Sequence, residues 1–249
     1  MKQKHVNIGS IDTLVLCGGR GARLKPIVSD KPKILANIGG SPFIKYLLEY
    51  LENEGIKRII LCTGYMYDQI EDWVQSSYHG DLDILFSREK NPLGTGGAIK
   101  NAQKLILGNN FLVINGDTFI ELNYRVFIES FLDKDAVGLF ALKKLKKTEA
   151  YGNVKVDSMN RIVSFIEKEN KFDHNYNDGL INVGVYLLNK ACLDVIPSNT
   201  KVSFERSTMQ LILKEFNNSI YGFYCEGSFI DIGTPRNYYR AHEILQKYA

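Results

Sequence analysis

Short apolar runs alternate with amphipathic segments along this chain, and this alternation is the feature that most limits its fold. The run Thr13–Cys17 is followed by a segment, Phe43 to Leu51, whose apolar residues recur at helical spacing, and then by a second run, Arg58–Thr63. The same order returns further along the chain. Buried strands that alternate with helices of this length form a mostly parallel sheet with helices on both faces.

The predicted elements keep this order to the end of the chain. Strands are predicted at Thr13–Cys17, Arg58–Thr63, Asp83–Phe86, Phe111–Asn115, Ala136–Leu142, Ile181–Leu188 and Ser219–Tyr224. Helices are predicted from Ser41 and Pro42, as N-cap and first residue, up to Gly55, and at Tyr67–Ser77, Ala98–Leu107, Tyr124–Leu132, Phe204–Phe216 and Arg236–Lys247. From Asn153 to Lys168 the pattern is typical of a hairpin with one solvent-exposed face. The sequence therefore predicts an α/β fold, a Rossmann-like, mostly parallel mixed sheet flanked by helices, in a single domain.

The composition excludes several classes of protein. Of the 249 residues, 45% are hydrophobic and 24% are charged, which excludes disordered, collagen-like and coiled-coil chains. No apolar run reaches the ~20 residues that span a bilayer, and Met1–Ser10 lacks the apolar stretch of a secretory signal. We therefore expect a cytoplasmic protein without membrane insertion.

The charged residues, cysteines and histidines add no further class of partner. The formal net charge is only +3, and the basic run Lys143–Lys147 is predicted to be a solvated loop or helix face, with nucleic-acid binding as the alternative. The 4 cysteines and 4 histidines are dispersed along the chain, without metal-ligand spacing. Neither a disulfide framework nor a zinc site is expected.

A glycine-rich loop, Gly18–Leu24 (GGRGARL), follows the first strand. Backbone N–H groups beside glycine are open to an anion, and Arg23 and Lys33 add positive charge, so the loop is suited to a triphosphate. The dinucleotide pattern GxGxxG would need glycine where Leu24 stands, and GxxxxGK[ST] is absent. A tight turn with surface cations is the alternative interpretation.

A second glycine loop, Asn91–Ala98 (NPLGTGGA), follows the third predicted strand. Its small residues let a flat base lie against the backbone, while Thr95 and exposed amides supply hydrogen bonds. A flexible connection is the alternative for this loop alone. Two glycine loops at the ends of neighbouring strands favour a nucleotide site.

Two aspartates form a second candidate set: Asp117 in NGD follows the buried strand Phe111–Asn115, and Asp231 in DIGTP follows Ser228–Ile230. Mg²⁺ takes one or two carboxylates together with phosphate oxygens and waters, so this pair is suited to hold it. An ordinary turn and a helix-start carboxylate are the alternatives, and only the meeting of the two in space decides between them. Glu167 with Lys168, Asn182 with Gly184, and Glu205 form a candidate set for a sugar phosphate, with solvated surface charges as the alternative.

In this order, and from Asp12 to Ala241, these segments resemble the sugar-1-phosphate nucleotidyltransferase family. The family pattern GGxGxRL followed by PK is matched by Gly18–Leu24 and Pro32–Lys33. The runs PLGTGGA, NGDT, FIEK, INVGVY and FIDIGTP are most similar to those of D-glycero-α-D-manno-heptose 1-phosphate guanylyltransferases. The chain departs from the family at Ala22, where threonine is usual, and at Ile34 and Asn37, where prolines are common.

The resemblance implies Mg²⁺-dependent transfer of a nucleotidyl group from a nucleoside triphosphate, with GTP favoured, to a sugar 1-phosphate, with the heptose favoured, for cell-surface glycan synthesis. It implies catalytic roles for Arg23 and Lys33 and Mg²⁺ binding by Asp117 and Asp231. The implied nucleotide-binding residues are Leu16, Gly18, Gly19, Gly21, Pro92, Gly94, Thr95 and Gly97. The implied sugar-phosphate-binding residues are Gly116, Gly152, Glu167, Lys168, Asn182 and Glu205. Residues 12–142 would form the nucleotide-binding half and residues 143–249 the sugar-phosphate-binding half.

Several alternatives stay open at this point. The base and the sugar could be those of a glucosamine-, mannose- or glucose-1-phosphate guanylyl- or uridylyltransferase. A non-catalytic homologue that binds a nucleotide sugar and regulates a partner is a second alternative, and a dinucleotide-dependent oxidoreductase, disfavoured by Leu24, is a third. A homo-oligomer is compatible with the sequence.

Overall fold

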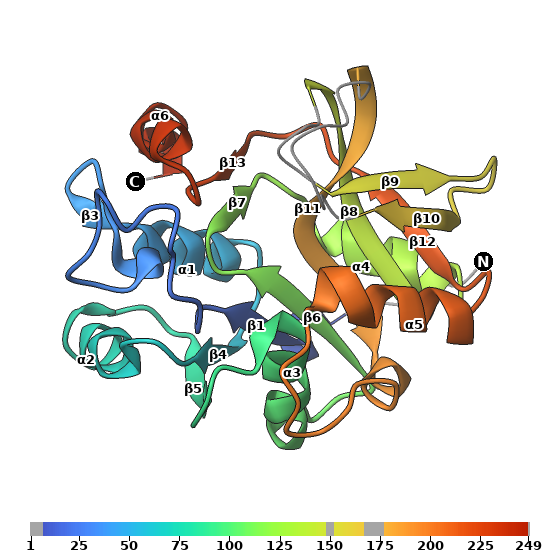
Figure 1. Ribbon diagram of the computed structural model, residues 1–249, viewed down its shortest axis with the longest axis horizontal. Helices are drawn as coiled ribbons and strands as arrows, with labels where there is room; N and C mark the ends of the chain where they lie inside the picture. Colours follow the sequence, from blue (N-terminus) through green and yellow to red (C-terminus); the bar gives the residue numbers. More distant parts are fainter. Residues whose placement is uncertain (1–6, 148–151, 167–176, 249) are drawn as a thin grey trace.

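The computed structural model describes residues 7–147, 152–166 and 177–248, and within them one mixed sheet crosses the molecule (Figure 1). Its strands are β1 (Asp12–Leu16), β4 (Arg58–Thr63), β5 (Asp83–Arg88), β6 (Asn110–Asn115), β8 (Gly138–Lys147), β9 (Asn153–Val156), β10 (Ile162–Ile166), β11 (Asn177–Asn189) and β12 (Ile220–Tyr224). Two short ribbons lie beside it: β2 (Asn37–Ile38) with β3 (Ser41–Pro42), and β7 (Thr118–Ile120) with β13 (Phe229–Asp231).

The strand order is β10-β9-β11-β6-β1-β4-β5, with β8 paired to both β11 and β12. Strand β1 lies parallel to β4 and β6, and β4 lies parallel to β5. Strand β11 runs antiparallel to β6, β8 and β9. The sheet is therefore parallel where the glycine loops leave it and mixed at the other end, and the predicted fold class is confirmed.

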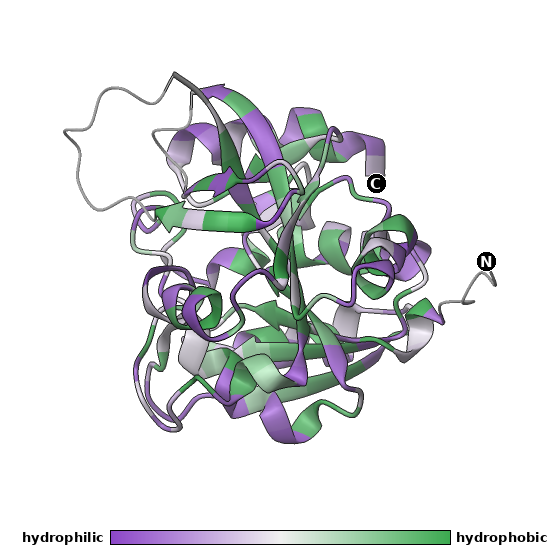
Figure 2. Cartoon of the chain, turned by 90° about the vertical axis from the view of Figure 1, so that its right-hand side faces the viewer, coloured by the Kyte–Doolittle hydropathy of each residue, from purple (hydrophilic) through white to green (hydrophobic). Residues whose placement is uncertain are grey.

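Helices cover both faces of the sheet. They are α1 (Phe43–Asn53), α2 (Tyr67–Ser77), α3 (Gly94–Asn101), α4 (Tyr124–Asp133), α5 (Met209–Glu215) and α6 (Pro235–Leu245). In the central strands successive residues point to opposite faces, so Leu14 belongs to the core cluster that includes residues of α3 and α5, and Val15 to the cluster that includes residues of α1, α2, α4 and α6. Figure 2 shows apolar residues gathered on the strands and on the helix faces turned toward them.

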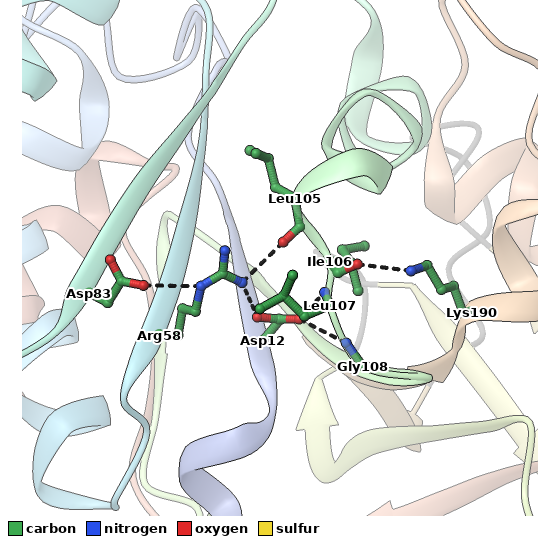
Figure 3. A network of polar contacts seen from close by, with 8 residues as sticks. All are labelled: Asp12, Arg58, Asp83, Leu105, Ile106, Leu107, Gly108 and Lys190. Atoms are coloured by element: carbon green, nitrogen blue, oxygen red, sulfur yellow. Dashed lines mark hydrogen bonds and ion pairs between the residues drawn. The ribbon is translucent and has the colours of Figure 1, made fainter.

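A polar network joins the amino ends of the parallel strands, at the edge opposite the glycine loops (Figure 3). Asp12 on β1 pairs with Arg58 on β4 and also accepts from the N–H groups of Leu107 (2.6 Å) and Gly108 (3.3 Å). Arg58 donates further to Leu105 O (3.0 Å) and to Asp83 on β5 (3.0 Å). One buried carboxylate thereby ties two strands to the loop that leads into β6.

Two predicted helix starts are wrong. Ser41 and Pro42 form the short strand β3, and α1 begins at Phe43, because Asn37–Ile38 pairs with Ser41–Pro42 across a tight turn. Helix α3 begins at Gly94 rather than Ala98 and gives way to a 3₁₀ turn at Ala102–Leu105. Much of the predicted second glycine loop is therefore the first turn of a helix.

Two other segments differ from the prediction. The predicted helix Phe204–Phe216 is a π turn at Phe204–Thr208 followed by α5. The basic run Lys143–Lys147 is neither loop nor helix but the end of β8, because the antiparallel partner β11 extends to Asn177 and continues the pairing.

Three further observations concern the hairpin, the cysteines and the length of the helices. The predicted hairpin is confirmed as β9 and β10 up to Ile166, with Ile162 and Phe165 buried and Val163 exposed between them. All 4 cysteines are buried and free. Among the described residues, no helix combines the length and apolar character that a bilayer crossing requires.

Candidate active site

The two predicted metal aspartates are brought together by the ribbon of β7 and β13. Asp231 ends β13 and stands opposite Thr118, the residue after Asp117. The Ile232 N–H donates to Asp117 O at 2.9 Å, so the two chain segments are held side by side beyond the carboxyl end of β6. Two carboxylates 114 positions apart in the sequence therefore face one site.

Gly233 marks the centre of this site. A Cβ built on Gly233 would lie 2.7 Å from Asp231 Oδ1, 3.2 Å from Arg23 Nη2 and 3.5 Å from Asp117 Oδ2. These three side-chain ends, from three distant segments, therefore converge on one small volume. Glycine at position 233 leaves that volume free of a methyl group.

Lys33 completes the group by an ion pair with Asp117. Lys33 begins a 3₁₀ turn, Lys33–Leu35, that leads into the β2–β3 ribbon, and Tyr238 Oη on α6 donates to Asn37 O in this ribbon at 2.7 Å. Because α6 begins only four residues after Asp231, this hydrogen bond joins the segment that carries Lys33 to the segment that carries Asp231. We call Arg23, Lys33, Asp117 and Asp231 the charged cluster.

The two carboxylates of the charged cluster differ in their surroundings. Burial acts to raise the pKa of the Asp117 carboxyl, but the charge and hydrogen bond of Lys33, with the charge of Arg23, hold this pKa below its usual range. Burial and then the negative charge of Asp117 raise the pKa of Asp231, although the Gly233 N–H lowers it in part. Asp117 is thus the more firmly ionised member of the pair.

The donor set of the charged cluster suits a hard cation that keeps phosphate and water ligands. Among the described residues, no group of three or more His, Cys, Asp or Glu could hold a metal by protein ligands alone. Mg²⁺ commonly takes just one or two carboxylates and fills its remaining positions with phosphate oxygens and waters. Asp117 and Asp231 therefore fit Mg²⁺, while metal binding by them stays a prediction.

The first glycine loop lies against the ends of three strands. Gly116 donates its N–H to Leu16 O at 3.0 Å, and a Cβ on Gly116 would lie only 2.6 Å from that oxygen. Gly18 accepts from the Tyr65 N–H, whereas Gly19 is exposed. Gly21 has φ +59°, a conformation that favours glycine, and packs on the Lys33 side chain. The loop therefore places Arg23 and Lys33 on the same side of the sheet edge.

The second glycine loop is used mainly for packing. A Cβ on Gly94 or Gly97 would lie 2.6 Å from the carbonyl oxygens of Val202 and Thr200, respectively. The Gly96 and Gly97 N–H groups both donate to Val202 O, at 2.9 and 3.3 Å, while Pro92 is exposed. The expectation that these amides are exposed is therefore wrong, because the segment before α5 caps the helix start. A nucleotide contact of Pro92, Gly94 or Gly97 stays a prediction.

Thr95 and Glu205, predicted to bind different substrates, bind each other. Thr95 Oγ1 donates to Glu205 Oε2 at 2.7 Å and accepts from the Phe204 N–H at 2.8 Å. Glu205 Oε2 also accepts from Ser203 Oγ at 3.2 Å. The single hydroxyl proton of Thr95 is thus already used within the protein.

Two of the other predicted sugar-phosphate residues, Gly152 and Asn182, lie beside a bulge in β11. Asn182 donates from Nδ2 to Tyr186 Oη at 2.6 Å and accepts from the Gly184 N–H at 3.0 Å, and its own N–H donates to Gly152 O at 3.0 Å. Gly184 has φ +77° at this bulge. Glu167 and Lys168 lie outside the described residues. Gly152 and Asn182 therefore lie side by side, and their contact with a sugar phosphate stays a prediction.

One residue beside the glycine loops was not predicted. Glu89 directly follows β5, and its Oε1 lies 3.2 Å from the position of a Cβ on Gly18, while its Oε2 accepts from the Leu93 N–H at 2.9 Å. Burial raises the pKa of this carboxyl, and the Leu93 hydrogen bond offsets part of the rise. Within the described part of the chain it has no ion-pair partner. A carboxylate between a predicted strand and a glycine loop was the signal in the sequence.

Comparison with known proteins agrees with this arrangement. The model of the family described as "Nucleotidyl transferase" matches residues 12–248. The D-glycero-alpha-D-manno-heptose 1-phosphate guanylyltransferase of Aneurinibacillus thermoaerophilus is 39% identical over 239 residues, which cover 96% of this chain and 100% of the relative. The enzyme of the same name from Campylobacter jejuni is 38% identical, over 92% of this chain and 97% of its own.

A solved structure has the same fold over nearly the whole chain. HddC from Yersinia pseudotuberculosis, complexed with GMP-PN, superposes with a TM-score of 0.81 and 39% identity, over 94% of this chain and 98% of that chain. The family match over residues 12–248 includes the charged cluster and both glycine loops, and it argues against the oxidoreductase alternative. This chain belongs to the nucleotidyl transferase family and is an enzyme of its sugar-1-phosphate nucleotidyltransferase branch.

Proposed function

We propose that this protein transfers a guanylyl group from GTP to D-glycero-α-D-manno-heptose 1-phosphate, with Mg²⁺, and so supplies a sugar donor for glycan synthesis. The observation that carries the proposal is the meeting of Arg23, Lys33, Asp117 and Asp231 around Gly233. The names of the relatives from Aneurinibacillus thermoaerophilus and Campylobacter jejuni support the choice of base and sugar.

In the proposed reaction an oxygen of the sugar phosphate attacks the α-phosphorus of the triphosphate in line. The bond between the α-phosphorus and its bridging oxygen to the β-phosphorus breaks, and pyrophosphate leaves with the electron pair. Such a transfer needs positioning and neutralisation of charge more than a protein nucleophile. Arg23, exposed at the rim of the charged cluster, would bind the leaving pyrophosphate, and Lys33 would neutralise charge on the reacting phosphates.

Asp117 and Asp231 would hold the Mg²⁺ ion, which supplies positive charge to the phosphate oxygens when bound. The ion pair with Lys33 keeps Asp117 ionised and oriented toward Gly233. Gly116, through its bond to Leu16 O, fixes the turn that carries Asp117. These contacts would pre-organise the site before substrates arrive.

Glu89 supports GTP as the nucleotide. Guanine presents two adjacent donors, N1–H and the N2 amino group, and a carboxylate can accept from both. Uracil and thymine present one N–H between two carbonyl oxygens, which a carboxylate would repel. Since Glu89 lies between the two glycine loops, it would select guanine through its edge.

We expect Glu89→Ala to lower kcat/KM for GTP by about 10²-fold, because hydrogen bonds to a charged group contribute about 1.5–3 kcal/mol. The preference for GTP over ITP, which lacks the N2 amino group, should fall close to 1. Pyrophosphate release with each nucleotide measures both quantities. Lys90→Ala, an exposed neighbour, is the control, and an unchanged GTP/ITP ratio in Glu89→Ala would contradict the assignment.

The reaction itself is tested by pyrophosphate release with Mg²⁺ over GTP, UTP, CTP, ATP and dTTP, each with heptose, mannose, glucose and glucosamine 1-phosphates. The proposal requires the largest kcat/KM for GTP with the heptose phosphate. A larger value for another sugar would assign one of the alternative guanylyl- or uridylyltransferase activities. Nucleotide binding without turnover in any combination would favour the non-catalytic homologue, which the intact charged cluster disfavours.

A further inference from the structure

The segment before α5, residues 200–205, is docked on the start of α3 by a dense set of contacts. Val202 O accepts from Gly96 and Gly97, and the Val202 N–H donates to Leu93 O at 2.8 Å. Thr95 and Glu205 add the hydrogen bond between their side chains, across 110 positions of sequence. In Figure 1 the orange chain leading to α5 passes directly beside α3. Residues 200–205 thereby hold the second glycine loop in place.

The contacts continue from this docked segment to Glu89. Leu93 accepts from Val202 through its carbonyl and donates through its N–H to Glu89 Oε2 at 2.9 Å. Leu93 therefore joins the docked segment directly to the carboxylate proposed to select the base. A displacement of residues 202–205 would move the donor that fixes Glu89.

The chemistry of Glu205 favours a role inside the protein. Its Oε2 accepts from the hydroxyls of Thr95 and Ser203, so the carboxylate is oriented toward α3. In the part of the chain that the structure describes, no lysine, arginine or histidine forms an ion pair with it. A negative charge held by two neutral donors would also repel the phosphate of a sugar phosphate.

We infer that Glu205 and Thr95 are positioning residues for base selection: their hydrogen bond fixes residues 202–205 on the start of α3 and, through Leu93, orients Glu89. The inference rests on the proposed function, in which Glu89 reads guanine. It replaces the expectation that Glu205 contacts the sugar phosphate and Thr95 the base. The nucleotide specificity of the first half of the chain thus depends on a residue of the second half.

The test compares equilibrium binding of GTP and ITP, with Mg²⁺ and without sugar phosphate, in Thr95→Val, Thr95→Ser and Glu205→Ala. We expect Thr95→Val and Glu205→Ala to lower the GTP/ITP affinity ratio by about fivefold, because both lose the hydrogen bond between Thr95 and Glu205, and one such bond contributes about 1 kcal/mol. Thr95→Ser keeps the hydroxyl and should keep the parental ratio. Ser207→Ala, exposed on the same π turn, is the matched control.

Steady-state kinetics with the sugar phosphate separates this role from a direct contact. A positioning role predicts an unchanged KM for the sugar phosphate in Glu205→Ala. A raised KM for the sugar phosphate with a parental GTP/ITP ratio would overturn the inference, as would a parental ratio in Thr95→Val. The GTP/ITP ratio is measured by binding, so an absence of turnover with every substrate would reject the proposed function and leave the inference standing. A parental GTP/ITP ratio in Glu89→Ala would reject both the reading of guanine by Glu89 and the inference.

Discussion

Lys33→Ala is expected to lower kcat by about 10²–10³-fold, since removal of one group that stabilises transition-state charge typically costs this much. Lys33 is the ammonium that pairs with Asp117, so its loss also leaves a part-buried carboxylate without its cation. Both consequences act on the reacting phosphates. Single-turnover formation of pyrophosphate at saturating nucleotide measures the chemical step directly.

Two control variants make this result specific. Lys31→Ala removes a lysine two positions before Lys33 whose contact is an exposed ion pair with Asp30 at 3.6 Å. Lys144→Ala removes an exposed lysine of β8. Both should keep parental turnover, because exposed pairs contribute little. Asp117→Ala should cost about as much as Lys33→Ala, and the double variant little more, since residues that act as a unit are not additive. Near-parental turnover in Lys33→Ala would reject the proposed role.

The sequence supplied the members of the charged cluster as candidates because a simple rule links such residues to the fold. Ligand sites of α/β sheets form beyond the carboxyl ends of strands, and Asp117, Arg23 and Lys33 follow a predicted strand or its glycine loop. The rule does not give distances. The antiparallel pairing of Asp231 with Thr118, which sets the two carboxylates side by side, has no local signal in either segment.

Contacts between distant segments explain the errors in the same way. Glycine disfavours helix, so Gly94–Gly97 was predicted as a loop, but the Val202 carbonyl accepts from two of these residues and stabilises the first helical turn. The residues near Thr95 gave no indication of Glu205, which is distant in sequence. Glu89 belongs to no short motif, and its place beside Gly18 follows only from strand order.

The amino-end network carries the largest expected effect on stability. Asp12→Ala should lower the free energy of unfolding by about 3–5 kcal/mol, as loss of one partner of a buried ion pair typically does. Asp12 is 2% exposed, and its removal takes one acceptor from Arg58 and leaves the N–H groups of Leu107 and Gly108 without the carboxylate that they bind. Urea unfolding followed by circular dichroism measures the change.

Asp83 offers a matched control within the same network, because it binds the same arginine from an exposed position, with 62% of its side chain accessible. Asp83→Ala should cost less than about 1 kcal/mol, the usual limit for exposed pairs. Since the network lies at the edge of the sheet opposite the charged cluster, folded Asp12→Ala protein should keep the parental kcat at a temperature below its unfolding transition. Equal losses of stability in the two variants would contradict the prediction. They would mean that the buried Asp12 stabilises the protein no more than an aspartate in an exposed ion pair with the same arginine.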